Sequence, residues 1–552
     1  MAEKIRDCFE LKFIFLLLAL LFALFLILPV LIIAFQSLGG DTGISSSFYS
    51  NIFTKANFIS ALKNSISISA AAGILTTLLA FVLAYTVNYT NLNRRIKRII
   101  STLAVLPMFL PTITYGFAII YSFGKQGLIT MLLGRQLFDI YGYPGLLTGY
   151  MIYTLPVAFM LIHNGMEYID KKFMTVSRIM GDSRLKTFIT TVLIPLLGTL
   201  AAAFIQSFTL SFTDYGIPAS VGGNTDLIAN LLYNEMLGSL PDFHSGSAVA
   251  IIMLLPSVIS IALTSWLSRY NIRYSRISRV ELSESRKRDF IFGLLSLLLL
   301  GSILMILLVI FIVPFVKSWP YVPEFTTEHV KRILGDFVLV GVYKNSLLIS
   351  VLTALFGTLA VYGAALISAR SSFRLTLGKL LDSIALVTGT IPGMVLGVAF
   401  LLTFKGTAVQ NTFFIIIVCN IVHFFSSPYL MMKGSLEKLN ASWENTAKLM
   451  GDSWLKTVVR IITPNAASTL AEVFSYYFIN AMVTVSAVIF IAGARTMVIT
   501  AKIKELQHFA NFNEIFVLST LILLTNIAAK GLFRLFTNRS KEKTKRERTQ
   551  YT

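Results

Sequence analysis

Charged side chains and cysteines are scarce in this sequence. Only 13% of its 552 residues are charged, which is about half the share found in ordinary soluble domains. The two cysteines are Cys8, near the start of the chain, and Cys419, inside an apolar run, so they predict no disulfide framework. The composition therefore argues against a soluble protein and against a disulfide-stabilised secreted domain.

Two absent motifs limit the chemistry. The sequence contains no Gly-x-x-x-x-Gly-Lys-Ser/Thr loop that would cradle nucleotide phosphates. It also contains no cluster of histidines or cysteines with the spacing of metal ligands. We therefore predict a chain that is not an enzyme, has no ATPase site and binds no cofactor of its own.

Long apolar runs are abundant, because 55% of the residues are hydrophobic. A bilayer core of about 30 Å needs about 20 apolar residues in one helix. Lipid offers no hydrogen-bond partners, so the backbone groups of a spanning segment must bond to one another, as they do in a helix. The runs predict an all-α membrane protein with about twelve transmembrane helices. They lie at residues 13–35, 65–86, 99–123, 145–164, 191–211, 245–267, 291–316, 345–367, 382–404, 413–432, 466–491 and 513–533.

The basic residues indicate how the chain crosses the membrane. Lys and Arg gather in alternate loops, whereas the long loop from Phe212 to Gly246 has none. This bias predicts a multi-pass membrane protein with both termini in the cytoplasm. The net charge of +20 then reflects topology and contact with the anionic lipid bilayer, and no nucleic-acid partner is expected.

The chain is a duplication. Lys-Asn-Ser occurs at residues 63–65 and again at 344–346, and residues 166–188 match residues 436–458 at eight of 23 positions. Both copies hold six apolar runs, so the repeats are parallel in orientation and should place a pathway between them. The predicted division is a first repeat (1–268), a cytoplasmic basic linker (269–290), a second repeat (291–535) and a basic cytoplasmic tail (536–552).

The two matching segments, which we name the repeated loops, are the most informative part of the chain. Each reads as a short amphipathic helix, then Gly-Asp-Ser, then a second helical run that ends near a proline. An apolar stripe on a surface helix indicates a docking element. Gly181 and Gly451 fit a helix C-terminus where a positive φ is needed.

The repeated loops resemble the "EAA" loop of binding-protein-dependent ABC importers. The family pattern is Glu-Ala-Ala, three residues, Gly, nine residues, Ile, one residue and Leu-Pro. Ile461 and Pro464 follow Gly451 at that spacing, whereas Pro195 follows Gly181 one residue later than the pattern. The resemblance places an ATPase-coupling role on Thr175, Val176, Ser177, Gly181, Asp182, Pro195, Asn445, Thr446, Ala447, Gly451, Asp452 and Pro464, although neither copy keeps the Glu-Ala-Ala triplet.

The resemblance implies the type I ABC importer permease fold in a bacterial plasma (inner) membrane. It also implies two kinds of partner: an ABC ATPase subunit, expected in two copies and using the ATP, and an extracellular or periplasmic solute-binding protein. The acidic loop from Asp214 to Asp242 is a candidate docking surface for the binding protein, unless its charge only reflects topology.

Pathway residues are harder to identify. Asp214 and Tyr215 begin a Gly- and Pro-rich run that has no clear counterpart in the second half, which suggests either a task in the outer vestibule or a re-entrant turn that only packs. Pro111 and Pro392 are expected to kink the third and ninth helices, and kinked helices commonly line pathways.

The substrate is predicted from resemblance alone. The stretch from Ser211 to Pro218 looks most like permeases for 2-aminoethylphosphonate, with iron(III) as the alternative and thiamine as a third related cargo. A twelve-helix secondary transporter is the alternative from another class. Such a transporter would couple to ions through charges at mid-membrane, and this chain has few.

Overall fold

The computed structural model describes residues 2–40, 43–44, 47–267, 285–371, 377–440 and 442–550. These residues are almost entirely helical, apart from two antiparallel hairpins formed by β1 (Gly39–Gly40) with β2 (Gly43–Ile44) and by β3 (Val316–Ser318) with β4 (Val322–Phe325). The predicted all-α class is confirmed. Residues 269–284 of the predicted linker lie outside the described residues, and the linker's last part already belongs to helix α15 (Arg286–Ile312).

Within the described ranges, nine helices are long and apolar enough to cross a membrane, or eleven spans if each of two bent helix pairs counts as one. The predicted number of twelve is therefore not confirmed. The difference arises at the predicted segment 466–491. There α24 (Thr463–Val483) ends early and carries Glu472 and Asn480, which lower its hydropathy.

The chain divides into two compact units. Unit 1 comprises residues 1–44, 333–510 and 520–552, and unit 2 comprises residues 45–332 and 511–519. The helices of unit 2 are α3 (Ser47–Thr54), α4 (Ala56–Tyr89), α5 (Arg94–Val105), α6 (Thr112–Phe123), α7 (Leu128–Leu133), α8 (Tyr143–Glu167), α9 (Lys172–Ile179), α10 (Arg184–Phe188), α11 (Ile194–Thr213), α12 (Gly216–Val221), α13 (Ile228–Leu237), α14 (Phe243–Leu267) and α15. Those of unit 1 are α1 (Ala2–Phe22), α2 (Leu28–Leu38), α17 (Phe337–Arg370), α18 (Lys379–Thr390), α19 (Gly393–Phe404), α20 (Phe413–His423), α21 (Ser426–Glu437), α22 (Ser442–Leu449), α23 (Trp454–Thr457), α24 and α25 (Ile499–His508), while α16 (Glu328–Gly335) and α26 (Phe512–Gln550) each contribute residues to both units.

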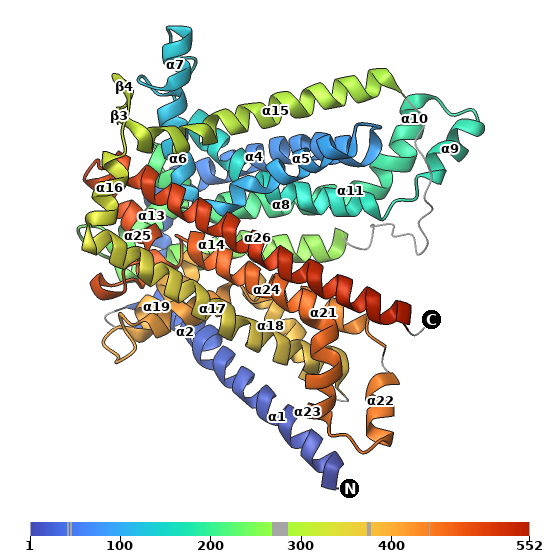
Figure 1. Ribbon diagram of the computed structural model, residues 1–552. Helices are drawn as coiled ribbons and strands as arrows, with labels where there is room; N and C mark the ends of the chain where they lie inside the picture. Colours follow the sequence, from blue (N-terminus) through green and yellow to red (C-terminus); the bar gives the residue numbers. More distant parts are fainter. Residues whose placement is uncertain are drawn as a thin grey trace. The chain divides into compact units, whose positions relative to one another are not determined.

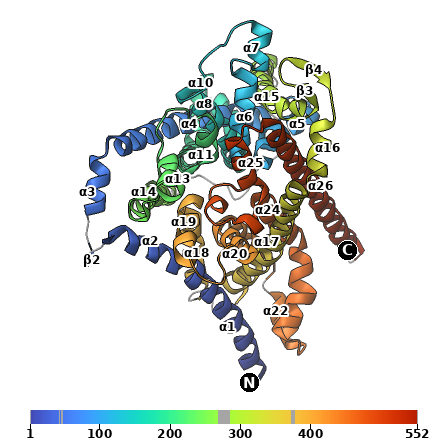
Figure 2. The same cartoon turned by 90° about the vertical axis from the view of Figure 1, so that its left-hand side faces the viewer.

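The compact units do not coincide with the sequence repeats, because the first helix of each repeat belongs to the unit built from the other. In unit 1, α2 lies beside α19, and Phe22 packs edge-on against Phe425 with ring centroids 4.7 Å apart (Figure 2). In unit 2, α15 runs alongside α4, where the hydroxyl oxygens of Thr86 and Ser296 are 2.7 Å apart (Figure 1).

Two helix breaks occur at the predicted prolines. Pro392 stands between α18 and α19, which are bent by 101°. Pro111 directly precedes α6, where the chain leaves the preceding helical turn and starts a new helix. Proline fixes φ and offers no amide hydrogen, so each break lies where the helical hydrogen bonds would fail.

Candidate functional site

The first repeated loop folds as two short helices joined by a tight turn. α9 ends at Ile179 with Met180 as its C-cap, Gly181 has a φ of +84°, and α10 follows. The amide of Asp182 donates to the carbonyl of Ser177 at 3.1 Å, and the amide of Gly181 donates to the carbonyl of Arg178 at 3.0 Å. This pair of bonds is a Schellman C-cap, which needs the left-handed residue that glycine supplies. The predicted positive φ is confirmed.

The second repeated loop repeats this geometry. α22 ends before Gly451, whose φ is +78°, and the amide of Asp452 donates to the carbonyl of Ala447 at 2.9 Å. Ser453 then caps α23 by accepting from the amide of Lys456, as Ser183 caps α10. The shared Met-Gly-Asp-Ser and Leu-Lys-Thr residues therefore encode one turn and the start of the helix after it, built twice.

The apolar stripes of both loops face outward. Ile179 and Met180 are 80% and 78% exposed, and Leu449 and Met450 are 90% and 78% exposed. The triplet positions divide between the two faces of each helix. Thr175, Val176, Asn445 and Thr446 are exposed, whereas Ser177 and Ala447 are buried. Each loop thus presents large apolar side chains that no part of the described chain covers.

The two prolines lie in the first turn of the helices that follow the loops. Pro195 begins α11 and is buried, and Pro464 begins α24 and is exposed. One π-helical turn precedes each of them, at Ile189–Leu193 and Val458–Ile462. The prolines therefore do not start these helices afresh, because a widened turn carries the helix into them.

Each loop is attached to the end of a long helix. In unit 2, the ammonium of Lys171 donates to the carbonyl of Asn88 near the end of α4 at 2.7 Å and lies 5.3 Å from the centre of the Tyr89 ring. In unit 1, the guanidinium of Arg370 at the end of α17 makes two hydrogen bonds to the Glu444 carboxylate, of 2.6 and 2.5 Å.

Arg370 also donates to two backbone carbonyls just before α22, those of Leu439 at 2.8 Å and Asn440 at 2.9 Å. Its side chain is only 4% exposed. Sequence analysis missed Lys171 and Arg370 because both belong to basic groups that the positive-inside rule already explains. Glu444 stands one residue before the triplet, which could have drawn attention to it.

Three pathway candidates lie together in unit 2. Asp214 is buried, accepts a hydrogen bond of 2.9 Å from the amide of Ile217, and is also bonded by the hydroxyl of Thr112, the residue after Pro111. Burial raises the pKa of the Asp214 carboxyl above its ordinary value, while these hydrogen bonds act in the opposite direction. Tyr215 stacks on Tyr233 with centroids 4.7 Å apart.

The fourth candidate, Pro392, lies in unit 1. A side chain on the next residue, Gly393, would meet the hydroxyl of Ser486 at 2.6 Å and Nε2 of His423 at 3.1 Å. Glycine is therefore needed where the helix break meets these polar groups. His423 is partly buried, and its buried Nδ1 has no hydrogen-bond partner within the described residues.

The loop predicted to dock a binding protein is exposed only in part. Its first part folds inward as α12, of which five of the six residues are buried. Residues 223–226 contain exposed positions, as do residues 234–242, where Leu240 is 91% exposed. Any docking surface here is restricted to these two stretches.

Comparison with known proteins defines the class of this chain. Residues 77–273 and 361–542 match the family described as binding-protein-dependent transport system inner membrane component. The matches cover more than half of the chain, with one in each repeat, so the chain belongs to this family.

Similar proteins include two that align along most of the chain. A putative ferric transport system permease protein of Haemophilus influenzae is 26% identical over 508 residues, 87% of this chain and 77% of that protein. A ferric transport system permease protein of Actinobacillus pleuropneumoniae is 26% identical over 479 residues, 82% of this chain and 67% of that protein. A bacterial ABC transporter that imports alginate has a solved chain that aligns at a TM-score of 0.41 and 16% identity, covering 48% of this chain and 99% of that chain.

The chain is thus a fused, duplicated permease of an ABC importer, a multi-pass inner-membrane protein that works with an ATPase subunit and a solute-binding protein. This family membership excludes the alternative of a secondary transporter.

Proposed function

We propose that this permease forms the membrane pathway of an iron(III) importer. Both relatives that align along most of the chain carry the word ferric in their names. They favour the alternative of the sequence analysis over 2-aminoethylphosphonate, which neither name supports. Selectivity resides mainly in the binding protein, so the membrane chain needs no iron site of its own to belong to such a system.

We further propose that the repeated loops receive the ATPase, with one ATPase copy on each loop. The observation that carries this proposal is the matched geometry of α9 and α22, each of which presents an uncovered apolar stripe before a left-handed glycine. Uncovered apolar side chains on a surface helix favour a protein partner. ATP is then bound by that partner, and both chain termini lie with the loops on the cytoplasmic side.

The substrate is tested through the partner binding protein. Thermal unfolding should be followed with ferric iron, 2-aminoethylphosphonate and thiamine, because a ligand that binds only the folded state raises the melting temperature. A rise with ferric iron alone, matched by uptake of labelled iron that needs this permease, supports the proposal. A rise with the phosphonate alone contradicts it and restores the other cargo.

The coupling role is tested at the two glycines. Replacing Gly181 and Gly451 by Val forces a β-branched residue into positive φ, so we expect uptake to fall to background while the protein stays in the membrane. Gly434→Val is the control, because Gly434 lies in helical α21 and a Cβ added there would have nothing within 4 Å. Normal uptake in the Gly181→Val/Gly451→Val variant would reject the coupling role.

A further inference from the structure

Two helices of 34 residues, α4 in unit 2 and α17 in unit 1, contain no proline and no break. Several other spans are interrupted: α8 holds Pro156, α14 holds Pro256, and the pairs α18–α19 and α20–α21 are bent by 101° and 57°. An unbroken helix keeps its hydrogen-bond ladder and transmits displacement along its axis better than a kinked one. α4 and α17 are therefore stiff connections, as are the unbroken helices α15 and α26.

One end of each long helix is attached to a repeated loop, through Lys171 for α4 and through Arg370 with Glu444 for α17. In Figure 1 these loops lie at one end of each unit, whereas α13 and α25 lie at the opposite end.

The far end of α4 caps α13. The residue before α13 offers no side-chain cap, and the hydroxyl oxygen of Ser65 instead accepts a hydrogen bond of 2.9 Å from the amide of Ile228, the first residue of α13. The neighbouring Asn64 donates its side-chain amide to the carbonyl of Asp226 at 3.1 Å. A side chain from one helix thus supplies the cap that another helix lacks.

The far end of α17 caps α25 in the same way. Ser346 accepts from the amide of Ile499, the first residue of α25, at 2.7 Å, and Asn345 donates to the carbonyl of Met497 at 3.2 Å. These are the Asn-Ser pairs that repeat at 64–65 and 345–346. We name each Asn-Ser pair, together with the backbone carbonyl and the backbone amide that it bonds, an Asn-Ser clasp.

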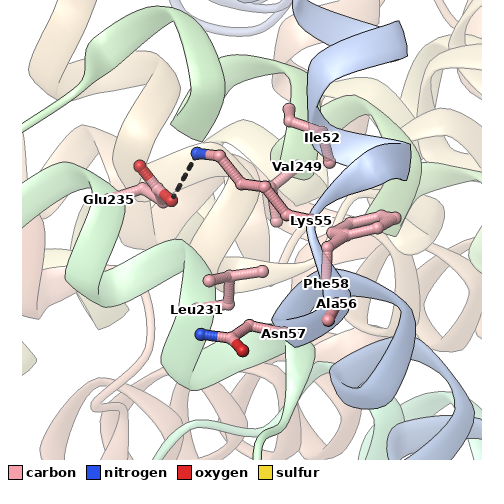
Figure 3. A pocket seen from close by; sticks show the side chains of 8 residues that line it. All are labelled: Ile52, Lys55, Ala56, Asn57, Phe58, Leu231, Glu235 and Val249. Atoms are coloured by element: carbon pink, nitrogen blue, oxygen red, sulfur yellow. Dashed lines mark ion pairs between the residues drawn. The ribbon is translucent and has the colours of Figure 1, made fainter.

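The first clasp has a further contact that the second lacks. Lys55 pairs with Glu235 of α13 at 3.7 Å, across a cavity of about 400 Å³ lined by α3, α4, α13 and α14 (Figure 3). In the second repeat the counterpart of Lys55 is Asp336, whose side chain caps α17 instead. The Asn-Ser clasp is therefore the element that both repeats share.

The distance between the two attachments matches a membrane. Ser65 and Asn88 are 23 residues apart in α4, and Ser346 and Arg370 are 24 residues apart in α17, which corresponds to about 35 Å of helix. A bilayer core is about 30 Å thick. Each long helix is therefore attached to a repeated loop at one membrane face and to a clasp at the other. The clasp of α4 bonds α13, and the clasp of α17 bonds α25.

We propose that α4 and α17 are connecting helices that carry motion of the repeated loops to α13 and α25 at the opposite membrane face, with Asn64, Ser65, Asn345 and Ser346 as positioning residues. This inference rests on the proposed coupling role of the loops. When an ATPase moves a loop, the attached long helix moves with it, and its clasp displaces α13 or α25, which opens or closes the far end of the pathway.

The test uses the full permease with its ATPase and binding protein, reconstituted in liposomes. Asn234 is exposed on α13, so an Asn234→Cys reporter can be labelled by a membrane-impermeant maleimide with and without nucleotide trapped in the ATPase. We expect nucleotide to change the labelling rate. Ser65→Ala together with Ser346→Ala should reduce that change about fivefold, the factor for one lost hydrogen bond of about 1 kcal/mol, and lower the substrate imported per ATP.

Controls separate this inference from the proposed function. Among the described residues, the hydroxyl of Ser67 bonds only to the carbonyl of Asn64 in the same helix, so Ser67→Ala should leave labelling unchanged. Asn64→Ala with Asn345→Ala is an independent pair that should act like the serine pair. If Gly181→Val/Gly451→Val abolishes the labelling response while both clasp pairs keep it in full, the connecting role is rejected and the coupling role stands. If the Gly181→Val/Gly451→Val variant also keeps the labelling response, the coupling role itself is rejected.

Discussion

The hydroxyl of Ser177 donates a hydrogen bond of 2.8 Å to the carboxylate of Asp182, across the left-handed turn at Gly181. The same hydroxyl lies 3.0 Å from that of Thr187, and Asp182 also pairs with Lys186 at 2.6 Å. The hydrogen bonds from Lys186 and then from Ser177 lower the pKa of the Asp182 carboxyl. The second repeated loop has Ala447 in place of Ser177, so its turn is held without this bond.

Ser177→Ala should loosen the first loop to the level of the second. The lost hydrogen bond is worth about 1 kcal/mol, so we expect amide hydrogen exchange of residues 178–182 to quicken about fivefold. Exchange measured by mass spectrometry in detergent or nanodiscs reports both loops in one sample, and residues 448–452 serve as the internal reference. Unchanged exchange in the first loop would show that the serine bond does not hold the turn.

Gly181→Asn should be tolerated where Gly181→Val is not. Asn adopts the left-handed conformation more readily than other residues with a side chain, and nothing lies within 4 Å of a Cβ atom placed at Gly181. We expect Gly181→Asn to keep most of the uptake and Gly181→Val to lose it. Equal loss in both would mean that bulk on the docking surface matters rather than backbone conformation.

Gly116→Ala should destabilise unit 2 because α6 and α12 touch at this glycine. An added Cβ would lie 1.7 Å from the hydroxyl oxygen of Ser220. Overpacking of this kind costs typically 1–3 kcal/mol. Thermal unfolding of the purified protein should show a lower midpoint for Gly116→Ala, with recovery when Ser220→Gly is added.

Gly301→Ala is the control for that experiment. Gly301 lies in α15 with nothing within 4 Å of an added Cβ, so its replacement should be neutral or slightly stabilising. A midpoint for Gly116→Ala that matches Gly301→Ala would contradict the close contact between α6 and α12.

Arg370→Gln should cost far more stability than Glu444→Gln. Removing Arg370 leaves the carboxylate of Glu444 and the carbonyls of Leu439 and Asn440 without their donor, and loss of one partner of a buried pair costs about 3–5 kcal/mol. Glu444→Gln keeps an acceptor and leaves the carbonyl bonds in place, so we expect a loss nearer 1 kcal/mol. Unfolding midpoints and exchange of α22 amides measure both.

Arg370→Lys distinguishes charge from geometry. A lysine keeps the positive charge but cannot make the two-pronged contact with Glu444 while also reaching two carbonyls. We expect it to resemble Arg370→Gln more than the natural protein. Full recovery by lysine would show that charge alone anchors α22.

Many structural features of this protein were predictable from its sequence, and they share one cause, which is that each depends on a short stretch of chain. Apolar runs, basic loops and the Gly-Asp-Ser turns are local signals, because lipid solvation, topology and a positive φ each act on a short stretch of chain. The all-α class, the duplication and the conformations of Gly181 and Gly451 followed from such signals and are confirmed. The helix breaks at Pro111 and Pro392 belong to the same group.

Other features depended on tertiary structure. Every span is apolar all along, so hydropathy contains no information about which helix packs against which, and the placement of α1–α2 with unit 1 and α15 with unit 2 could not be read from it. The Lys-Asn-Ser repeat was visible in the sequence, but its contacts with residues some 150 to 160 positions away were not. The role of a polar side chain inside a membrane protein depends on the partner that folding brings to it. Ser65, Ser346 and Arg370 meet their partners only in the folded chain.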